Sequence, residues 1–304
     1  MAPRHNLAVT VAFHVVCLAA VAVPVLVFFA AGRPFKRGFF CDDESLMYPF
    51  RESTVTSNML YLFGTFIPVI TMVVLEMVRG YTQVPETIAT SSRPFLRWRV
   101  PPVLQVLYVM VGVFAFGAAS SQLVTDIAKY TIGRLRPHFF DLCQVANLEQ
   151  LCKDPHAYVE DFQCKASISD HLRKEMRLSF MSGHSSFSAF TMLYTVLYLQ
   201  ARMPWRSTLA RAGRAVIQMA LLCLAWYTAL SRISDYKHHW SDVLAGAFQG
   251  YLAAILVVWG LSPLWQQLRR QSSINGDSDT YQSCRTETAV PLPPRGRPRG
   301  ADVP

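Results

Sequence analysis

The chain has 304 residues, of which 52% are hydrophobic and only 16% are charged, and its mean hydropathy is +0.23. Because soluble proteins carry about 25% charged residues, a water-soluble globular protein is not expected. The formal net charge of +9 would suit nucleic acid, anionic lipid or a phosphorylated substrate as a partner. The positions of the charges along the chain decide among these partners.

Six segments contain no Asp, Glu, Lys or Arg and are predicted to cross a membrane as helices. Three of them exceed the roughly 20 residues that span a bilayer. The other three are shorter, and each alone could equally be a buried helix of a soluble protein. Because three long spans are already present, we expect all six to be transmembrane. Extended to the expected helix ends, the spans are about 7–31, 58–78, 103–127, 185–201, 214–230 and 243–264.

Residues 1–268 are predicted to form one membrane domain that contains all six spans. The first span is longer than the apolar part of a signal peptide, so we expect it to be retained. Residues 269–304 are rich in Ser, Pro, Gly and Arg without periodicity, which predicts a disordered tail. An even number of spans places this tail and the N-terminus on the same side of the membrane.

The connections between the spans predict the orientation. Segments 79–99 and 202–214 each contain four arginines, which is typical of cytoplasmic loops, so both termini would be cytoplasmic. The outer side would carry 32–57, 126–184 and 231–242. Four cysteines lie in the two longer outer segments, where an oxidising compartment permits disulfides but the sequence leaves the pairing open. They are Cys41, Cys143, Cys152 and Cys164.

Three clusters of basic and histidine residues lie on the predicted outer side. Because basic residues are favoured in cytoplasmic loops, the membrane orientation does not explain these clusters. The first reads Lys129-Tyr-Thr-Ile-Gly-Arg-Leu-Arg136-Pro137, after the third span. Lys129 and Arg136 are seven residues apart, about two helical turns, so both would project from one face if the helix continued to Pro137. Side chains that snorkel from a helix end are the alternative explanation.

The second cluster, Ser182-Gly183-His184, directly precedes the fourth span. Ser182 and Gly183 are typical of a helix N-terminus, where free backbone N–H groups and the positive end of the helix dipole attract an anion. His184 would then lie where the anion docks. A simple N-cap beside an interfacial histidine would fit the same residues.

The third cluster runs from Ser231-Arg232 to His238-His239 and Asp242, before the sixth span. His238 and Asp242 are four residues apart, so on a helix the carboxylate would bind one imidazole nitrogen and leave the lone pair of the other facing outward. A histidine held in this way is prepared to act as a nucleophile or a base. The alternative is an ordinary ion pair on a helix surface.

Antiparallel spans would bring the three clusters together at one membrane face. The permanent cations Lys129, Arg136 and Arg232, with backbone donors and two histidines, suit a phosphate monoester. One histidine would attack phosphorus and the other would protonate the departing alkoxide. Since the cations take the place that metal ions hold in other phosphoryl-transfer sites, we expect neither a metal nor an organic cofactor.

These clusters, in this order and with these spacings, resemble the signature of the lipid phosphate phosphatases, or type 2 phosphatidic acid phosphatases. That pattern is Lys, six residues, Arg-Pro; then Ser-Gly-His; then Ser-Arg, five residues, His, three residues, Asp. The resemblance covers residues from about 7 to 268, and the segment from Lys36 resembles the animal plasma-membrane members. It implies an all-α integral membrane protein with six transmembrane helices and the helical-bundle core of the superfamily that includes vanadium haloperoxidases.

The resemblance also implies a role for each residue of the clusters. His238 would be the nucleophile that forms a phosphohistidine, Asp242 would orient His238, and His184 would be the general acid. The phosphate would be bound by Lys129, Arg136, Ser182, Gly183 and Arg232. The implied reaction is metal-independent hydrolysis of phosphatidate, lysophosphatidate, sphingosine 1-phosphate and ceramide 1-phosphate at the extracellular or lumenal face.

Two other classes of protein compete with this interpretation. A catalytically silent relative would bind lipid phosphates without hydrolysing them, but it would be expected to lack some of the motif residues. A transporter or channel would be expected to carry ionisable residues in mid-span, whereas the middle of each predicted span has no Asp, Glu, Lys or Arg, and Glu76 lies at an inner end. The expected partners are lipids, not nucleic acid, in the plasma membrane or alternatively in internal membranes. Lipid preference and assembly into a homo-oligomer are left open by the sequence.

Overall fold

The computed structural model describes residues 7–82, 93–95, 98–165, 167–203 and 207–269. The chain divides into two compact units, 1–265 and 266–304, and the first unit contains every helix and strand named below. The predicted tail, 269–304, lies outside the described residues apart from Arg269.

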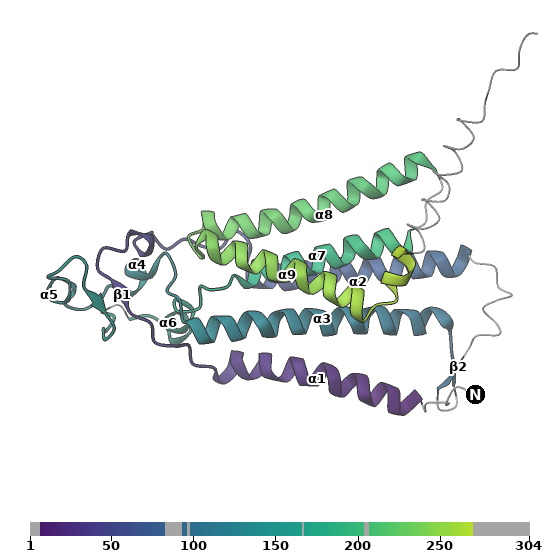
Figure 1. The fold of residues 1–304 in the computed structure, drawn as a ribbon, viewed down its shortest axis with the longest axis horizontal. Helices are drawn as coiled ribbons and strands as arrows, with labels where there is room; N and C mark the ends of the chain where they lie inside the picture. The colour runs from purple at the N-terminus through teal and green to yellow at the C-terminus, as the bar shows by residue number, and fades with distance from the viewer. Residues whose placement is uncertain (1–6, 83–92, 96–97, 166, 204–206, 270–304) are drawn as a thin grey trace, which may run out of the picture. The chain divides into compact units, whose positions relative to one another are not determined.

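Six long helices of the first unit lie side by side and alternate in direction (Figure 1). Five of them are long and apolar enough to cross a membrane, and α7 is the exception. Large apolar side chains such as Phe29 and Val216 are 77% and 70% exposed, as expected where helices contact lipid. The chain is therefore an all-α, multi-pass membrane protein. The helices are α1 (Leu7–Ala31), α2 (Ser57–Thr82), α3 (Pro102–Ile132), α7 (Gly183–Arg202), α8 (Thr208–Ser234) and α9 (Trp240–Gly260).

Helix α7 lies at the centre of the bundle, which explains its lower hydropathy. It contacts α2, α3, α8 and α9, and most of its side chains are buried. Its hydroxyl groups donate to carbonyls of the preceding turn, as Thr191 Oγ1 does to Phe187 O at 2.9 Å. Because α7 meets other helices instead of lipid, it does not need an apolar surface.

Close backbone approach holds α9 against α7. Gly246 and Gly250 have the Gly-x-x-x-Gly spacing that lets two membrane helices come together. A Cβ atom at Gly246 would lie 2.5 Å from Ser182 O, and one at Gly250 would collide with Ser186 O. The two helices that carry the second and third clusters are thus placed by their backbones.

Several observed helix ends differ from the predicted ones, and the C-terminal ends of α3 and α9 differ for a clear physical reason. Helix α3 ends at Gly133, whose φ of 60° lies in the left-handed region that glycine favours. The helix therefore does not continue to Pro137, and the prediction that Lys129 and Arg136 share one helical face is wrong. Helix α9 ends at Gly260 and not at about 264, because Pro263 cannot continue a helix.

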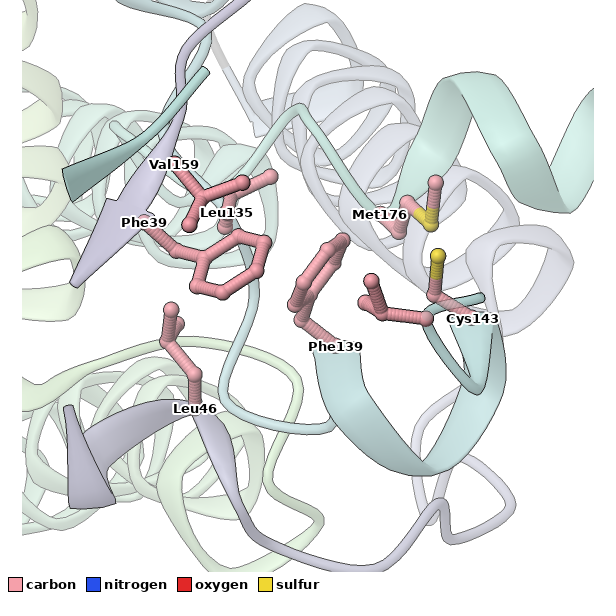
Figure 2. Packing of buried hydrophobic residues seen from close by; sticks show 8 residues of the cluster. Phe39, Leu46, Leu135, Phe139, Cys143, Val159 and Met176 are labelled. Carbon is pink, nitrogen blue, oxygen red and sulfur yellow. The ribbon is translucent and has the colours of Figure 1, made fainter. Parts of the chain in front are cut away.

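A cap built from the two longer connections covers the end of the bundle where α3 ends and α7 begins (Figure 1). Strands β1 (Phe39–Phe40) and β4 (Tyr158–Val159) pair antiparallel in it. The short helices η1 (Glu44–Leu46), α4 (Phe139–Cys143), α5 (Leu148–Leu151) and α6 (Asp170–Glu175) complete it. Its hydrophobic core consists of Phe39, Leu46, Leu135, Phe139, Cys143, Val145, Val159 and Met176 (Figure 2).

Two disulfides close the cap, Cys41–Cys152 and Cys143–Cys164. They establish the pairing that the sequence left open. A second short pair of strands, β2 (Arg93–Phe95) and β3 (Trp98–Val100), lies in the connection between α2 and α3.

Candidate active site

The three sequence clusters meet under the cap. Lys129 occupies the last turn of α3, Ser182 is the N-cap of α7, and His238 lies in the turn between α8 and α9. A Cβ atom at Gly183 would lie 3.2 Å from Lys129 Nζ, so glycine leaves room for the ammonium group at the start of α7. The predicted N-cap is confirmed, since Ser182 Oγ accepts a hydrogen bond from Ser185 N.

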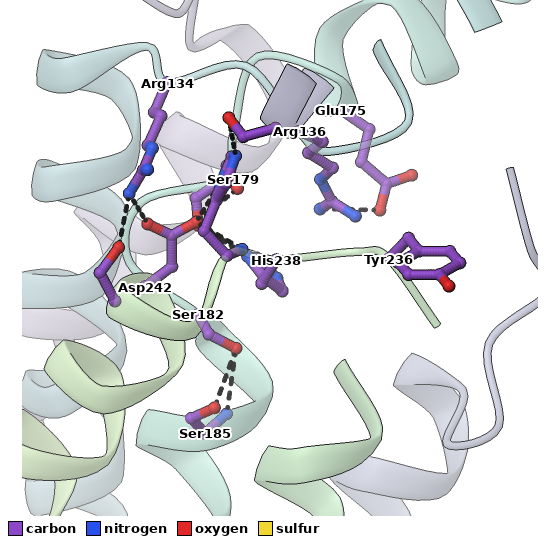
Figure 3. Close-up of polar contacts among 12 residues, drawn as sticks. Arg134, Arg136, Glu175, Ser179, Ser182, Ser185, Tyr236, His238 and Asp242 are labelled. Carbon is purple, nitrogen blue, oxygen red and sulfur yellow. Dashed lines mark hydrogen bonds and ion pairs between the residues drawn. The ribbon is translucent and has the colours of Figure 1, made fainter. Parts of the chain in front are cut away.

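A backbone carbonyl orients His238. Its Nδ1 lies 2.7 Å from Ser179 O (Figure 3). Because a carbonyl oxygen can only accept, Nδ1 carries the proton and the lone pair lies on Nε2. Burial, together with the charges of Arg136 and Lys129, holds the pKa of His238 well below its usual value. The imidazole is therefore neutral at pH 7, and the lone pair of Nε2 is not used in the contact with Ser179.

Asp242 lies behind His238 without binding its imidazole directly. Helix α9 begins two residues after His238, so the predicted helical i, i+4 geometry does not apply, and Nδ1 is 4.0 Å from Asp242 Oδ2. This is beyond hydrogen-bond distance. The carboxylate accepts hydrogen bonds from Ser179 Oγ at 2.6 Å and from Arg134 (Figure 3). Asp242 thus contacts His238 through Ser179.

The turn before α9 is shaped by contacts with other elements. Tyr236 has a φ of 53°, which is uncommon for a residue with a side chain, and its carbonyl lies 2.8 Å from His138 Nδ1. Burial lowers the pKa of His138 to about 4, so it stays neutral and donates from Nδ1. The N–H groups of Lys237 and His238 both donate to Arg232 O. His138 was not predicted as a site residue, and its only signal in the sequence is its position directly after the first cluster.

Arg136 and Arg232 are buried, and not all of their hydrogen-bond donors have a partner among the described residues. Arg136 forms an ion pair with Glu175 at 3.1 Å, and Arg232 one with Asp235 at 3.5 Å. Among the described residues, neither arginine has a partner for its buried Nε. A buried unpaired donor costs about 1–3 kcal/mol. Two such donors in one site suit a ligand that is rich in acceptors.

Residues 48–55, here called the 48–55 segment, bind the same groups from the cap side. Val55 O accepts hydrogen bonds from His184 Nε2 at 3.1 Å and from Arg232 Nη1 at 3.0 Å. Ser53 Oγ accepts one from Arg232 Nη2 at 3.2 Å. Since a carbonyl only accepts, His184 carries a proton on Nε2. Because any residue has a backbone carbonyl, the sequence does not indicate that Val55 O makes these contacts.

The structure brings all the predicted site residues together at this place. Within the part of the chain that the structure describes, no group of three or more His, Cys, Asp or Glu is arranged to hold a metal ion. The assembled residues are Lys129, Arg136, Ser182, Gly183, His184, Arg232, His238 and Asp242.

Comparison with known proteins identifies the family. Residues 110–265, which include all three clusters, match the PAP2 superfamily, and the chain belongs to it. The resemblance noted in the sequence is thereby confirmed.

Three relatives illustrate the similarity. A Drosophila melanogaster protein that bears the provisional name of a phosphatidate phosphatase is 47% identical over 84% of this chain and 69% of its own length. Phospholipid phosphatase 1 of Rattus norvegicus is 41% identical over 89% of this chain and 91% of its own. Phospholipid phosphatase 2 of Bos taurus is 38% identical over 85% and 84%, respectively. No solved structure is a significant match.

Proposed function

We propose that this protein is a phosphatase that hydrolyses lipid phosphate monoesters to the dephosphorylated lipid and inorganic phosphate. The substrates would be phosphatidate, lysophosphatidate, sphingosine 1-phosphate and ceramide 1-phosphate. Membership of the PAP2 superfamily and the names of the relatives support lipid phosphate hydrolysis. The observation that carries the proposal is the pair of buried Nε donors of Arg136 and Arg232, which have no partner among the described residues, beside a neutral His238.

The first step forms a phosphohistidine. The lone pair on His238 Nε2 attacks phosphorus, an N–P bond forms, and the P–O bond to the lipid alcohol breaks. In the substrate complex His184 acts as an imidazolium with both nitrogens protonated; it gives its Nε2 proton to the departing alkoxide and becomes neutral, a role worth about 10²–10⁴ in rate for a typical general acid. Lys129, Arg136 and Arg232 hold the non-bridging oxygens and stabilise the charge of the transition state.

The second step releases phosphate. His184, now lacking that proton, takes one from water as the water attacks phosphorus, and the N–P bond breaks. His238 returns to its neutral form. Asp242 acts through Ser179, whose carbonyl orients His238 in both steps. Ser182 and the N–H of Gly183 assist the phosphate at the positive end of α7.

A membrane location favours lipid substrates. The site lies at the ends of α3, α7 and α9, so a lipid phosphate would arrive by lateral diffusion while its tails stay in hydrocarbon. A soluble phosphate ester would gain nothing from this arrangement.

Replacement of the nucleophile tests the proposal. His238→Ala should lower phosphate release from phosphatidate in detergent micelles by at least about 10³-fold. His156→Ala is the matched control, because this histidine is exposed in the cap and pairs only with Asp42 among the described residues. EDTA should leave the wild-type rate unchanged.

Each other outcome has a distinct meaning. Undiminished turnover by His238→Ala would contradict the phosphohistidine. Inhibition by EDTA would indicate that the reaction uses a metal. A wild-type protein that binds phosphatidate without releasing phosphate would be a catalytically silent relative.

A further inference from the structure

A fourth cation lies beside the three that the sequence pattern contains. We propose that Lys237 is a further phosphate-binding residue of this active site and that the 48–55 segment occupies its ammonium group while no substrate is bound. This inference rests on the proposed phosphatase function.

Lys237 is buried without a polar partner for its side chain among the described residues. It directly precedes His238 in the turn before α9, and only 6% of it is exposed. Its Nζ lies 3.7 Å from the centroid of the Phe50 ring. An aromatic face attracts a cation, but it satisfies none of the three N–H donors of an ammonium group. Lys237 therefore retains donors for a ligand.

The charges around Lys237 place it at the phosphate site. Among the described residues, the charges with the largest effect on its pKa come from separate parts of the chain: Arg136 after α3, Arg232 on α8, Glu175 on α6 and Glu52 in the 48–55 segment. Burial and the two arginines lower the pKa of Lys237 to about 8, although the two carboxylates raise it. Repulsion between Lys237 and the two neighbouring arginines raises the free energy of the site, and a bound anion would remove this repulsion.

The charge balance of the site matches a phosphate monoester. Two of its four cations have carboxylate partners, since Arg136 pairs with Glu175 and Arg232 with Asp235. Lys129 and Lys237 are not in ion pairs with carboxylates in the described part of the chain. A phosphate monoester is a dianion above about pH 7, so two unneutralised lysines would complement it.

The 48–55 segment contacts Lys237 as it contacts the other phosphate-binding groups. Phe50 covers the ammonium of Lys237, as Val55 O and Ser53 Oγ cover the guanidinium of Arg232. One short segment thus occupies the positions next to Lys237 and Arg232 where the phosphate would bind. Its hold is reinforced by Thr54, whose N–H and Oγ1 both donate to the side chain of Asp235 at 2.8 Å. A substrate would displace these contacts and bind Lys237 together with Arg232.

Binding is tested with Lys237→Met and Lys237→Arg, with Lys153→Met, an exposed cap residue, as the control. Two quantities are measured: kcat/KM for lysophosphatidate in micelles and the inhibition constant Ki of inorganic phosphate. Loss of a charged hydrogen bond is worth about 1.5–3 kcal/mol, so Lys237→Met should raise Ki and lower kcat/KM by about 10–100-fold. Lys237→Arg should restore both to within a few-fold of wild type.

The pH profile separates a charge effect from a structural one. Because Lys237 loses its proton as the pH rises through about 8, kcat/KM of the wild type should fall above that pH. A guanidinium stays protonated, so Lys237→Arg should show no such fall up to about pH 10.

Two results would overturn the assignment of Lys237. One is an unchanged Ki in Lys237→Met, and the other is a fall near pH 8 that persists in Lys237→Arg. If Lys237→Met does not fold, the comparison of Lys237→Arg with wild type decides. Absence of phosphate release by the wild type would instead contradict the proposed function. Stabilisation of the protein by inorganic phosphate, measured as a shift in Tm, would then still test Lys237.

Discussion

At the scale of single residues, Ser179 connects the carboxylate of Asp242 to the imidazole of His238. Its hydroxyl donates to Asp242 and its carbonyl accepts from His238. A substitution can remove the hydroxyl but not the carbonyl. The two contacts of Ser179 can therefore be separated by experiment.

Ser179→Ala should lower kcat by about 10–100-fold, because a hydrogen bond to a carboxylate worth about 1.5–3 kcal/mol is lost while the carbonyl that orients His238 remains. The Ki of inorganic phosphate should not change. Ser234→Ala, at the exposed end of α8, is the control. Asp242→Asn should add little to Ser179→Ala if both act through one contact, and additive losses in kcat would refute this coupling.

The residues of the site were predictable from their types and spacing, but their contacts were not. His184, His238 and the three cations stand in a recognisable pattern. The predicted bond between His238 and Asp242 assumed a helix, whereas His238 lies in a turn. Contacts made by backbone carbonyls, such as those of Ser179 and Val55, have no signature in a sequence.

At the scale of elements, the crossing of α7 and α9 sets the position of the second cluster relative to the third. Backbone meets backbone at this crossing, and Ser182 N donates to Asp242 O at 3.0 Å. No side chain separates the two helices at Gly246. The distance between His184 and His238 depends on that contact.

Gly246→Ala should lower both kcat and Tm, since the new Cβ would lie 2.5 Å from Ser182 O and overpacking costs about 1–3 kcal/mol. The matched control is Gly260→Ala at the other end of α9, where a Cβ would meet nothing within 4 Å. Equal effects of the two substitutions on kcat would argue against the crossing as the determinant of site geometry.

The long helices were predictable because apolar segments of bilayer length have few other interpretations. Helix α7 was one of three shorter spans that could each have been a buried helix of a soluble protein, and it is buried among four other helices. The strands of the cap were not predicted, because β1 and β4 have only two residues each and show no periodicity. The pairing of the cysteines needed the fold of the cap.

At the scale of the whole molecule, the cap and the bundle share the first cluster. Leu135 lies in the hydrophobic core of the cap, while its neighbours bind other partners: Arg134 contacts Asp242 and Arg136 contacts Glu175. Since both disulfides lie in the cap, we propose that this end faces the extracellular or lumenal side and that the termini are cytoplasmic. We expect the plasma membrane as the location.

Glycosylation tests this orientation, because the chain has no Asn-x-Ser/Thr sequon of its own. Glu149→Ser, which completes a sequon at the exposed Asn147 of the cap, should yield a glycosylated protein whose mass falls on endoglycosidase treatment. Asp277→Ser, which completes a sequon at Asn275 in the tail, should not. The reverse result would place the cap in the cytoplasm.

The hydrogen bonds of Val55 to His184 and Arg232 have a consequence for affinity. If substrate binds only after the 48–55 segment has moved aside, the observed Kd is the intrinsic Kd divided by the fraction of molecules that are open. Two proteins with identical phosphate-binding residues would then differ in affinity through this fraction alone. The residues that anchor the segment, such as Thr54, would tune substrate affinity without touching the substrate.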